Sequence, residues 1–263
     1  MGELIDSLSV ARIGVFRDEV ARRSGRSRND IRRGEVESLY IWQTSIAAAW
    51  YETIALFEPL LRNRLDTGLR QWNTQRGHSP DWLDDPASPL KGLVHRMALS
   101  SRKAADTAAK RRAPMHPRHG VRATIDDRVA QLSFGNLASL FPQDPPAHRN
   151  KLASGFTAYE NLWLHGLSWS FPGLSQKFVT DAKFAYGFKA PNSVEPAYAI
   201  GNSLESLRRL RNRVSHQEQI LYVDHSVRLK ELYGLTHAMA PQSLGLMKRL
   251  DRVQRTLALR PQY

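Results

Sequence analysis

A short run beginning at residue 211 holds the side chains that phosphate chemistry needs. Arg211 and Asn212 are followed by His216 within the segment RNRVSH. An imidazole has an ordinary pKa of about 6.5, so His216 can act as a general acid or base near neutral pH. The guanidinium of Arg211 offers a planar fork of donors that matches phosphate oxygens. Arg211, Asn212 and His216 are therefore the candidate catalytic residues, with Asn212 placed to orient His216 or a ribose.

These side chains need a helix to position them. Asn202 and Glu205 have the spacing of an N-cap residue and its capping-box partner, which predicts a helix start near Ser203. Three apolar residues form the expected buried side of this helix: Leu204, Leu207 and Val214. The polar side chains are then expected on the opposite, solvent-facing side of the helix.

The polar surface of this helix follows from its turn of about 100° per residue. Arg208, Asn212 and His216 fall on one face, and Arg211 and Ser215 fall on the neighbouring strip. Arg211 and His216 lie about 140° apart around a straight helix, so they cannot both reach one small ligand. Either the helix ends near Ser215 or a second copy of the chain completes the site. An arginine-rich face that is simply solvated is the competing interpretation.

This group of residues suits cleavage of RNA without a metal ion. The ribose 2′-OH is an internal nucleophile next to the scissile phosphate. The protein then has to deprotonate this hydroxyl, stabilise the additional negative charge on phosphorus and protonate the leaving 5′-oxygen. In this hypothesis His216 is the general acid or base and Arg211 stabilises the phosphate.

Several segments resemble those of a known family. RNRVSHQEQIL, residues 211–221, resembles the signature of HEPN-superfamily domains in the form found in Abi-like (abortive infection) proteins. LFEPLLRNRLDTGL, residues 56–69, resembles a second segment of the family, and its matching residues are Glu58, Arg62 and Asn63. Other stretches resemble the family in the right order: residues 39–58, 77–83, 129–141 and 251–261. The resemblance therefore covers most of the chain.

The resemblance implies a fold, an activity and partners. The fold is expected to be all-α, a single HEPN-like helical bundle over residues 1–263 with additional helices and loops. Active members are metal-independent endoribonucleases, without a cofactor, whose Arg and His meet across a homodimer. Such an enzyme is expected to act in phage defence or as a toxin, and a cognate antitoxin would be a further partner. The chain departs from the family pattern at Leu137, Gln217 and Gln219, which keeps open a catalytically inert RNA-binding or protein-interaction module.

Composition favours a polyanionic partner. The 263 residues include 38 Lys and Arg against 25 Asp and Glu, which gives a net charge of +13. Such an excess favours RNA or DNA through phosphate contacts, and a basic surface without a partner is the alternative. A basic loop insertion around residues 110–122 is the expected RNA-binding surface, with candidate residues Lys110, Arg111, Arg112, Arg118 and Arg122. A DNA-binding regulator is disfavoured because no recognition-helix motif is found.

The residue types disfavour several other chemistries. The chain has no cysteine, which excludes disulfides, thiolate metal sites and a cysteine nucleophile. His116 and His119 lack a third ligand nearby, so no metal site is expected. Asp126 and Asp127 are interpreted as residues of a helix first turn rather than a Mg²⁺ site. Without a signal peptide or a long apolar segment, the expected location is the cytoplasm, away from a membrane.

Hydrophobic periodicity predicts helices throughout, because no convincing strand pattern is found. A short helix is predicted over residues 7–22 and a long one from about Val36. The apolar stripe of the long helix is Leu39, Trp42, Ile46, Trp50, Ile54, Phe57 and Leu61. Pro59 should kink or restart this helix, and Glu58 and Arg62 have the spacing of an ion pair.

The rest of the chain alternates predicted loops and helices. Residues 73–92 have loop composition, with Trp82 and Leu83 expected to point inward. Further helices are predicted over residues 93–113, 124–141, 174–188 and 243–259. Phe184 or Ala185 is assigned to the buried side of the third of these. The buried stripe of the last is Leu244, Met247, Leu250, Val253 and Leu257.

Overall fold

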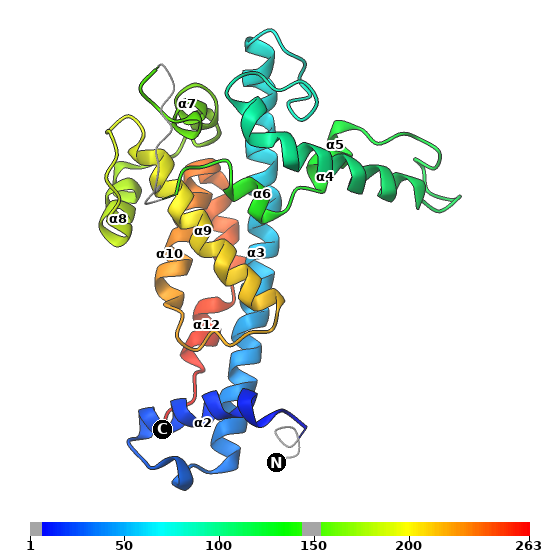
Figure 1. The fold of residues 1–263 in the computed structure, drawn as a ribbon. Helices are drawn as coiled ribbons and strands as arrows, with labels where there is room; N and C mark the ends of the chain where they lie inside the picture. Colours follow the sequence, from blue (N-terminus) through cyan, green and yellow to red (C-terminus); the bar gives the residue numbers. More distant parts are fainter. Residues whose placement is uncertain (1–6, 144–153) are drawn as a thin grey trace.

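The described part of the chain is built from helices. The computed structural model describes residues 7–143 and 154–263, and all the regular elements in them are helical, which confirms the predicted all-α class (Figure 1). The α-helices are α2 (Val10–Ser24), α3 (Arg33–Gln75), α4 (Leu90–Lys110), α5 (Ile125–Ala130), α6 (Phe134–Ala138), α7 (Ala158–His165), α8 (Gln176–Tyr186), α9 (Glu195–Ser215), α10 (His225–Met239), α11 (Leu244–Leu250) and α12 (Val253–Ala258). Short 3-10 turns are η1 (Arg28–Asp30), η2 (Leu167–Ser170) and η3 (Pro241–Ser243).

Helix α3 is the long element against which much of the chain packs (Figure 1). Its predicted stripe from Leu39 to Leu61 is buried. Pro59 lies inside this one helix, so the predicted restart is wrong. Proline cannot donate to the Ala55 carbonyl, but Ala55 and Pro59 are both exposed, so water can reach that oxygen. Packing of Phe57 and Leu61 on the opposite side keeps the helix continuous.

Helix α9, which carries the candidate residues, begins at Glu195 rather than near Ser203. Pro196 stands in its first turn, where a missing N–H is tolerated. Asn202 is buried inside the helix, and its Nδ2 donates to the Tyr198 carbonyl at 3.0 Å. Gly201 is required there because a Cβ atom would overlap the Pro142 carbonyl. The expected N-cap, Asn202, is therefore a buried residue of the helix interior.

Two predicted helices are each divided in two. Residues 124–141 form α5 and α6, and Ser133 ends the break by accepting from the Asn136 N–H. The chain also breaks between α11 and α12 at Asp251, a buried carboxylate that accepts from Tyr233 at 2.7 Å and Thr53 at 3.0 Å. A local cap at Ser133 and long-range bonds at Asp251 thus override the periodicity of the sequence. Leu250 is consequently exposed rather than part of a buried stripe.

Two separate groups of helices lie beside α3 (Figure 1). Helix α9 packs against α3, α6, α8 and α10, and its buried side includes Leu204, Leu207 and Val214 as predicted. Helices α4 and α5 pack together as an arm that projects to one side of α3. Trp82 and Leu83, in the loop before this arm, are buried as predicted, whereas Phe184 of α8 is exposed, which contradicts its expected place on the buried side. A search of the described helices finds none with the length and apolar character needed to cross a membrane.

Candidate functional site

Helix α9 ends in a backbone reversal that presents His216. His216 is the C-cap residue, and the Glu218 N–H donates back to the Arg213 carbonyl at 2.8 Å. The Gln217 N–H donates to the Val214 carbonyl at 3.1 Å, which completes a Schellman motif. Gln217 occupies the left-handed position of this motif with φ 53°, where glycine or asparagine is usual. An unusual backbone conformation thus lies directly beside the candidate imidazole, as is common at functional sites.

Replacing Gln217 with glycine should stabilise the fold by about 1 kcal/mol, because glycine adopts positive φ without a Cβ clash. Urea unfolding would measure the change. Ser215→Gly is the matched control, since Ser215 is exposed in the last turn of α9 and glycine there should destabilise the helix. Equal destabilisation by both variants would contradict the assigned left-handed strain.

His216 lines a hollow of about 810 Å³ between the first half of α2, residues 40–51 of α3 and the end of α9. Arg12, Arg213, Tyr40 and Tyr51 line it as well. The loop that follows α9 is held in place by its neighbours. Arg12 donates to the Gln217 carbonyl, and the Ile220 N–H donates to Gln43 of α3 at 2.9 Å. The backbone around His216 is therefore held in place, and its exposed imidazole lines the same concave surface as the guanidinium groups of Arg12 and Arg213.

The chain alone does not bring the predicted catalytic residues into one place. Arg211 and Asn212 are partly exposed on α9, but neither lines the hollow that contains His216. Within the described ranges, the side chains of Arg211, Asn212 and His216 have no hydrogen bond or ion pair. Helix α9 ends at Ser215, which confirms one of the two expected alternatives, but this ending still leaves Arg211 outside the hollow at His216.

Arg213 is the arginine that the motif did not identify. It lines the same hollow as His216 and lies 3.6 Å from Glu218. The sequence contained a signal, because residues three apart in a helix are neighbours on its surface. The family pattern assigns a role to Arg211 and none to Arg213. Its position makes it a candidate for contacting an anion held next to His216.

The second family-like segment lies beside α6. Arg62 donates to Glu58 at 3.0 Å, which confirms the predicted ion-pair geometry, and to the Leu132 carbonyl at 2.9 Å. The pair therefore connects α3 to the loop before α6. Asn63 is exposed next to it, and none of these three residues lines the hollow at His216.

Two further supporting candidates lie on α9 itself. Arg208 is held by Glu205 at 2.6 Å, and Ser215 is exposed in the last turn. Neither of them lines the hollow that contains His216. Of the supporting candidates, Arg208 and Arg62 are thus already engaged in ion pairs.

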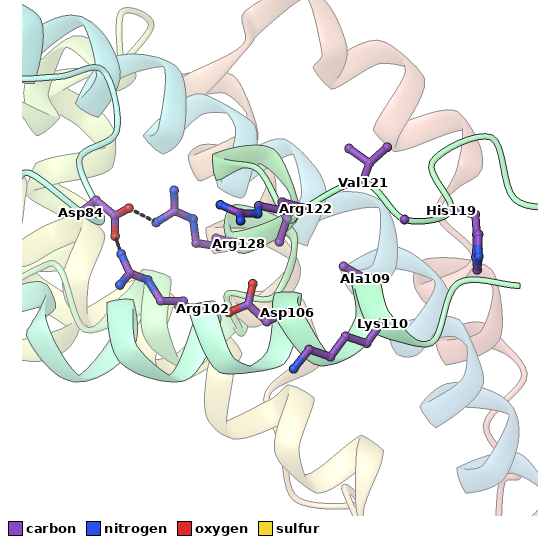
Figure 2. A pocket seen from close by; sticks show the side chains of 11 residues that line it. Asp84, Arg102, Asp106, Ala109, Lys110, His119, Val121, Arg122 and Arg128 are labelled. Atoms are coloured by element: carbon purple, nitrogen blue, oxygen red, sulfur yellow. Dashed lines mark hydrogen bonds and ion pairs between the residues drawn. The ribbon is translucent and has the colours of Figure 1, made fainter. Parts of the chain in front are cut away.

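The projecting arm carries a second concave surface, of about 630 Å³, between α4 and residues 119–123 (Figure 2). Lys110 and Arg122 line it and are exposed. Figure 2 shows Asp84 between Arg102 and Arg128, which both form ion pairs with it. Lys110 and Arg122 form no ion pair with another described residue, unlike Arg102 and Arg128. Arg111 is also exposed but does not line this surface.

Two of the predicted RNA-binding residues have a structural task. Arg112 and Arg118 both pair with Asp127, at 3.0 and 2.5 Å. Arg112 also donates to the Arg118 and Val121 carbonyls, so it organises the loop from inside. The Arg118 guanidinium, together with the Thr124 and Arg112 donors, holds the pKa of the Asp127 carboxyl well below its usual range. Asp127 also closes the capping box of α5, which confirms its expected place in a helix first turn.

The described ranges contain no group of three or more His, Cys, Asp or Glu side chains arranged to hold a metal ion. His116 and His119 instead contact the backbone of their own loop, at Arg118 and Arg112. These contacts give both histidines a role in the loop conformation.

The comparisons with known proteins add no relative. No family model matches the chain. No curated protein and no solved structure matches it either. These comparisons therefore assign the chain to no family.

Proposed function

We propose that this chain is a metal-independent endoribonuclease of the HEPN/Abi-like type, acting in phage defence or as a toxin. The observation that carries the proposal is the position of His216. Its imidazole is exposed at a fixed helix end and lines a concave surface together with two arginines. An imidazole at the edge of a concave surface is placed to exchange a proton with a substrate bound there.

The proposed reaction uses the ribose as its own nucleophile. His216 accepts the proton of the 2′-OH, the 2′-oxygen attacks phosphorus, and the bond to the 5′-oxygen breaks as that oxygen takes up a proton from water. The protonated His216 then returns its proton to water. The products are a 2′,3′-cyclic phosphate and a 5′-hydroxyl. A guanidinium stabilises the additional negative charge that develops on the phosphate oxygens. The exposed cations of the arm, Lys110, Arg111 and Arg122, hold the flanking backbone in this proposal.

In the proposed enzyme the guanidinium of Arg211 comes from a second copy of the chain. Arg211 lies outside the hollow that His216 lines, and its side chain has no hydrogen bond or ion pair to another described residue. A homodimer that brings two α9 ends together places the Arg211 of one protomer beside the His216 of the other. Arg213 lies in the hollow of its own chain and is the competing source of positive charge.

Mixing Arg211→Ala protein with His216→Ala protein should restore cleavage that each lacks alone. Random exchange of subunits makes about half of the dimers mixed. Each mixed dimer has one intact site and one doubly substituted site, so about a quarter of wild-type activity is expected. Arg213→Ala alone is the control, because Arg213 lines the hollow of its own chain and lies outside the proposed pair of Arg211 and His216, so this variant should still cleave. Loss of cleavage in Arg213→Ala together with full activity in Arg211→Ala would exchange the roles of the two arginines. An inactive wild-type protein would instead count against the ribonuclease itself.

A non-catalytic RNA-binding module is the second candidate, favoured by the exposed cations on the arm. It predicts RNA binding that weakens with salt and with charge reversal at Lys110 and Arg122, without any cleavage.

A further inference from the structure

The hollow at His216 contains an amide whose orientation is fixed. Gln43 of α3 lines this hollow and is only 6% exposed. Its Oε1 accepts from the Ile220 N–H at 2.9 Å, so the other end of the amide is the NH₂ group. This Nε2 makes no hydrogen bond with any described residue, and it is not an enclosed atom. A nearly buried side chain thus presents an unpaired donor to the concave surface.

The walls around this amide leave room for a flat group. Along α3, Tyr40 and Tyr51 line the hollow about three turns apart. The lining between them on this helix includes small side chains, those of Thr44, Ala47 and Ala48. The total volume of about 810 Å³ is within the range of small-molecule sites, which combine apolar walls with a few placed polar groups.

The reaction proposed above indicates which part of an RNA lies here. His216 has to reach a ribose 2′-OH, and this ribose also carries a base. The base of that nucleotide is therefore the one closest to the other walls of the hollow. An amide donor beside apolar walls suits a base, because its faces stack and its edge carries hydrogen-bonding groups.

We propose that the base of the nucleotide with the attacking 2′-OH enters this hollow, where Gln43 Nε2 donates to a carbonyl oxygen of the base. The proposal rests on the ribonuclease function proposed above and makes Gln43 a residue that determines specificity. Guanine and hypoxanthine carry a carbonyl oxygen at the six-position of the purine, whereas adenine carries an amino group. Two donors cannot pair, so adenine should be disfavoured directly 5′ of the cut.

The first test compares 2′-deoxyinosine 3′-phosphate with 2′-deoxyadenosine 3′-phosphate by NMR titration of the wild-type protein. The probes share the phosphate and the purine skeleton and differ at the six-position and at the proton on N1. The inosine probe should bind about tenfold more tightly, because only its carbonyl pairs with the nearly buried donor. Equal affinity for both probes, or no binding of either, would overturn the proposal.

Gln43→Glu tests the donor itself, at about pH 8 to keep the new carboxylate ionised. One carboxylate oxygen can still accept from the Ile220 N–H, and the other puts an acceptor in place of Nε2. The preference should therefore reverse in favour of the adenosine probe.

Gln219→Glu is the matched control. Gln219 lines the same hollow, and its Oε1 accepts from the Leu221 N–H at 3.0 Å, but its side chain is less buried than that of Gln43. The added charge should weaken both probes equally and leave their ratio unchanged. A reversal in Gln219→Glu but not in Gln43→Glu would overturn the assignment of Gln43.

Ala48→Trp locates the binding without altering the amide. Ala48 is exposed and lines the hollow, so an indole there should block both probes while the protein stays folded by circular dichroism. Unchanged affinity in this variant would place the probes elsewhere and overturn the proposal.

The outcomes separate the base site from the ribonuclease. Neither probe has a 2′-OH, so binding is measured whether or not the protein cleaves RNA. Selective binding by a protein that does not cleave would support the base site and contradict the ribonuclease. Cleavage that is equally frequent after guanine and after adenine would overturn the base site and leave the ribonuclease intact.

Discussion

Replacing His216 with alanine should lower the rate of RNA cleavage by about 10²–10⁴-fold, the usual contribution of a general acid or base. The fold should be unaffected, because the His216 side chain is exposed and makes no hydrogen bond or ion pair with any described residue. Single-turnover cleavage of a labelled RNA would give the rate. Circular dichroism and urea unfolding would verify that the variant is folded.

The control for this substitution is His95→Ala. His95 is also exposed, on α4, and lies outside both the His216 hollow and the surface on the arm. It should leave the rate unchanged. A loss of activity shared by His95→Ala and His216→Ala would indicate a general effect of charge or folding, and full activity of His216→Ala would remove the proposed acid–base residue.

Stability should depend on pH through two buried groups with opposite signs. Burial raises the pKa of Glu231 to about 7, against the opposing effects of Tyr186, Arg228 and Ser206. The folded state thus holds that proton more tightly, and stability falls as pH rises from about 4.5 to 7. Burial, with help from Arg260, lowers the pKa of His225 to about 4. Stability linked to His225 is present above about pH 6.5 and is lost as pH falls towards 4.

The two contributions should largely cancel in the wild-type protein between about pH 4.5 and 6.5. Glu231→Gln leaves only the histidine effect, so its stability relative to wild type should increase as pH rises. His225→Gln keeps an acceptor for the Trp50 N–H and should show the reverse trend. Each difference should span about 3 kcal/mol.

Urea unfolding at pH 4.5, 5.5, 6.5 and 7.5 would measure these differences, since other titrating groups affect variant and wild type alike. Curves that stay parallel across this range would show that neither group has a displaced pKa. A change in only one variant would identify which of the two buried groups carries the effect.

Regular periodicity explains why much of the fold was predictable. The stripe from Leu39 to Leu61 repeats at three- and four-residue steps, and only a helix puts those residues on one side. Trp82 and Leu83 could be predicted as buried because large apolar side chains in a polar loop are stabilised by packing into the core. Spacing of four residues likewise predicted the ion pair of Glu58 and Arg62.

Tertiary contacts explain what was missed. Asn202 and Glu205 have a capping pattern, but α9 extends back to Glu195 because its earlier residues pack in the core. Asp251 interrupts the last predicted helix because Thr53 and Tyr233, distant in sequence, bind its carboxylate. The hollow at His216 also needs residues from α2 and α3, so the place of Arg213 in it depends on long-range packing.

The central claim is tested most directly by incubating cellular RNA with purified wild-type and His216→Ala proteins in EDTA, followed by chemical analysis of the new ends. The proposed ribonuclease predicts cleavage by the wild type alone, with 2′,3′-cyclic phosphate and 5′-hydroxyl ends. Cleavage that needs a divalent metal, leaves 5′-phosphate ends or persists in His216→Ala would contradict it.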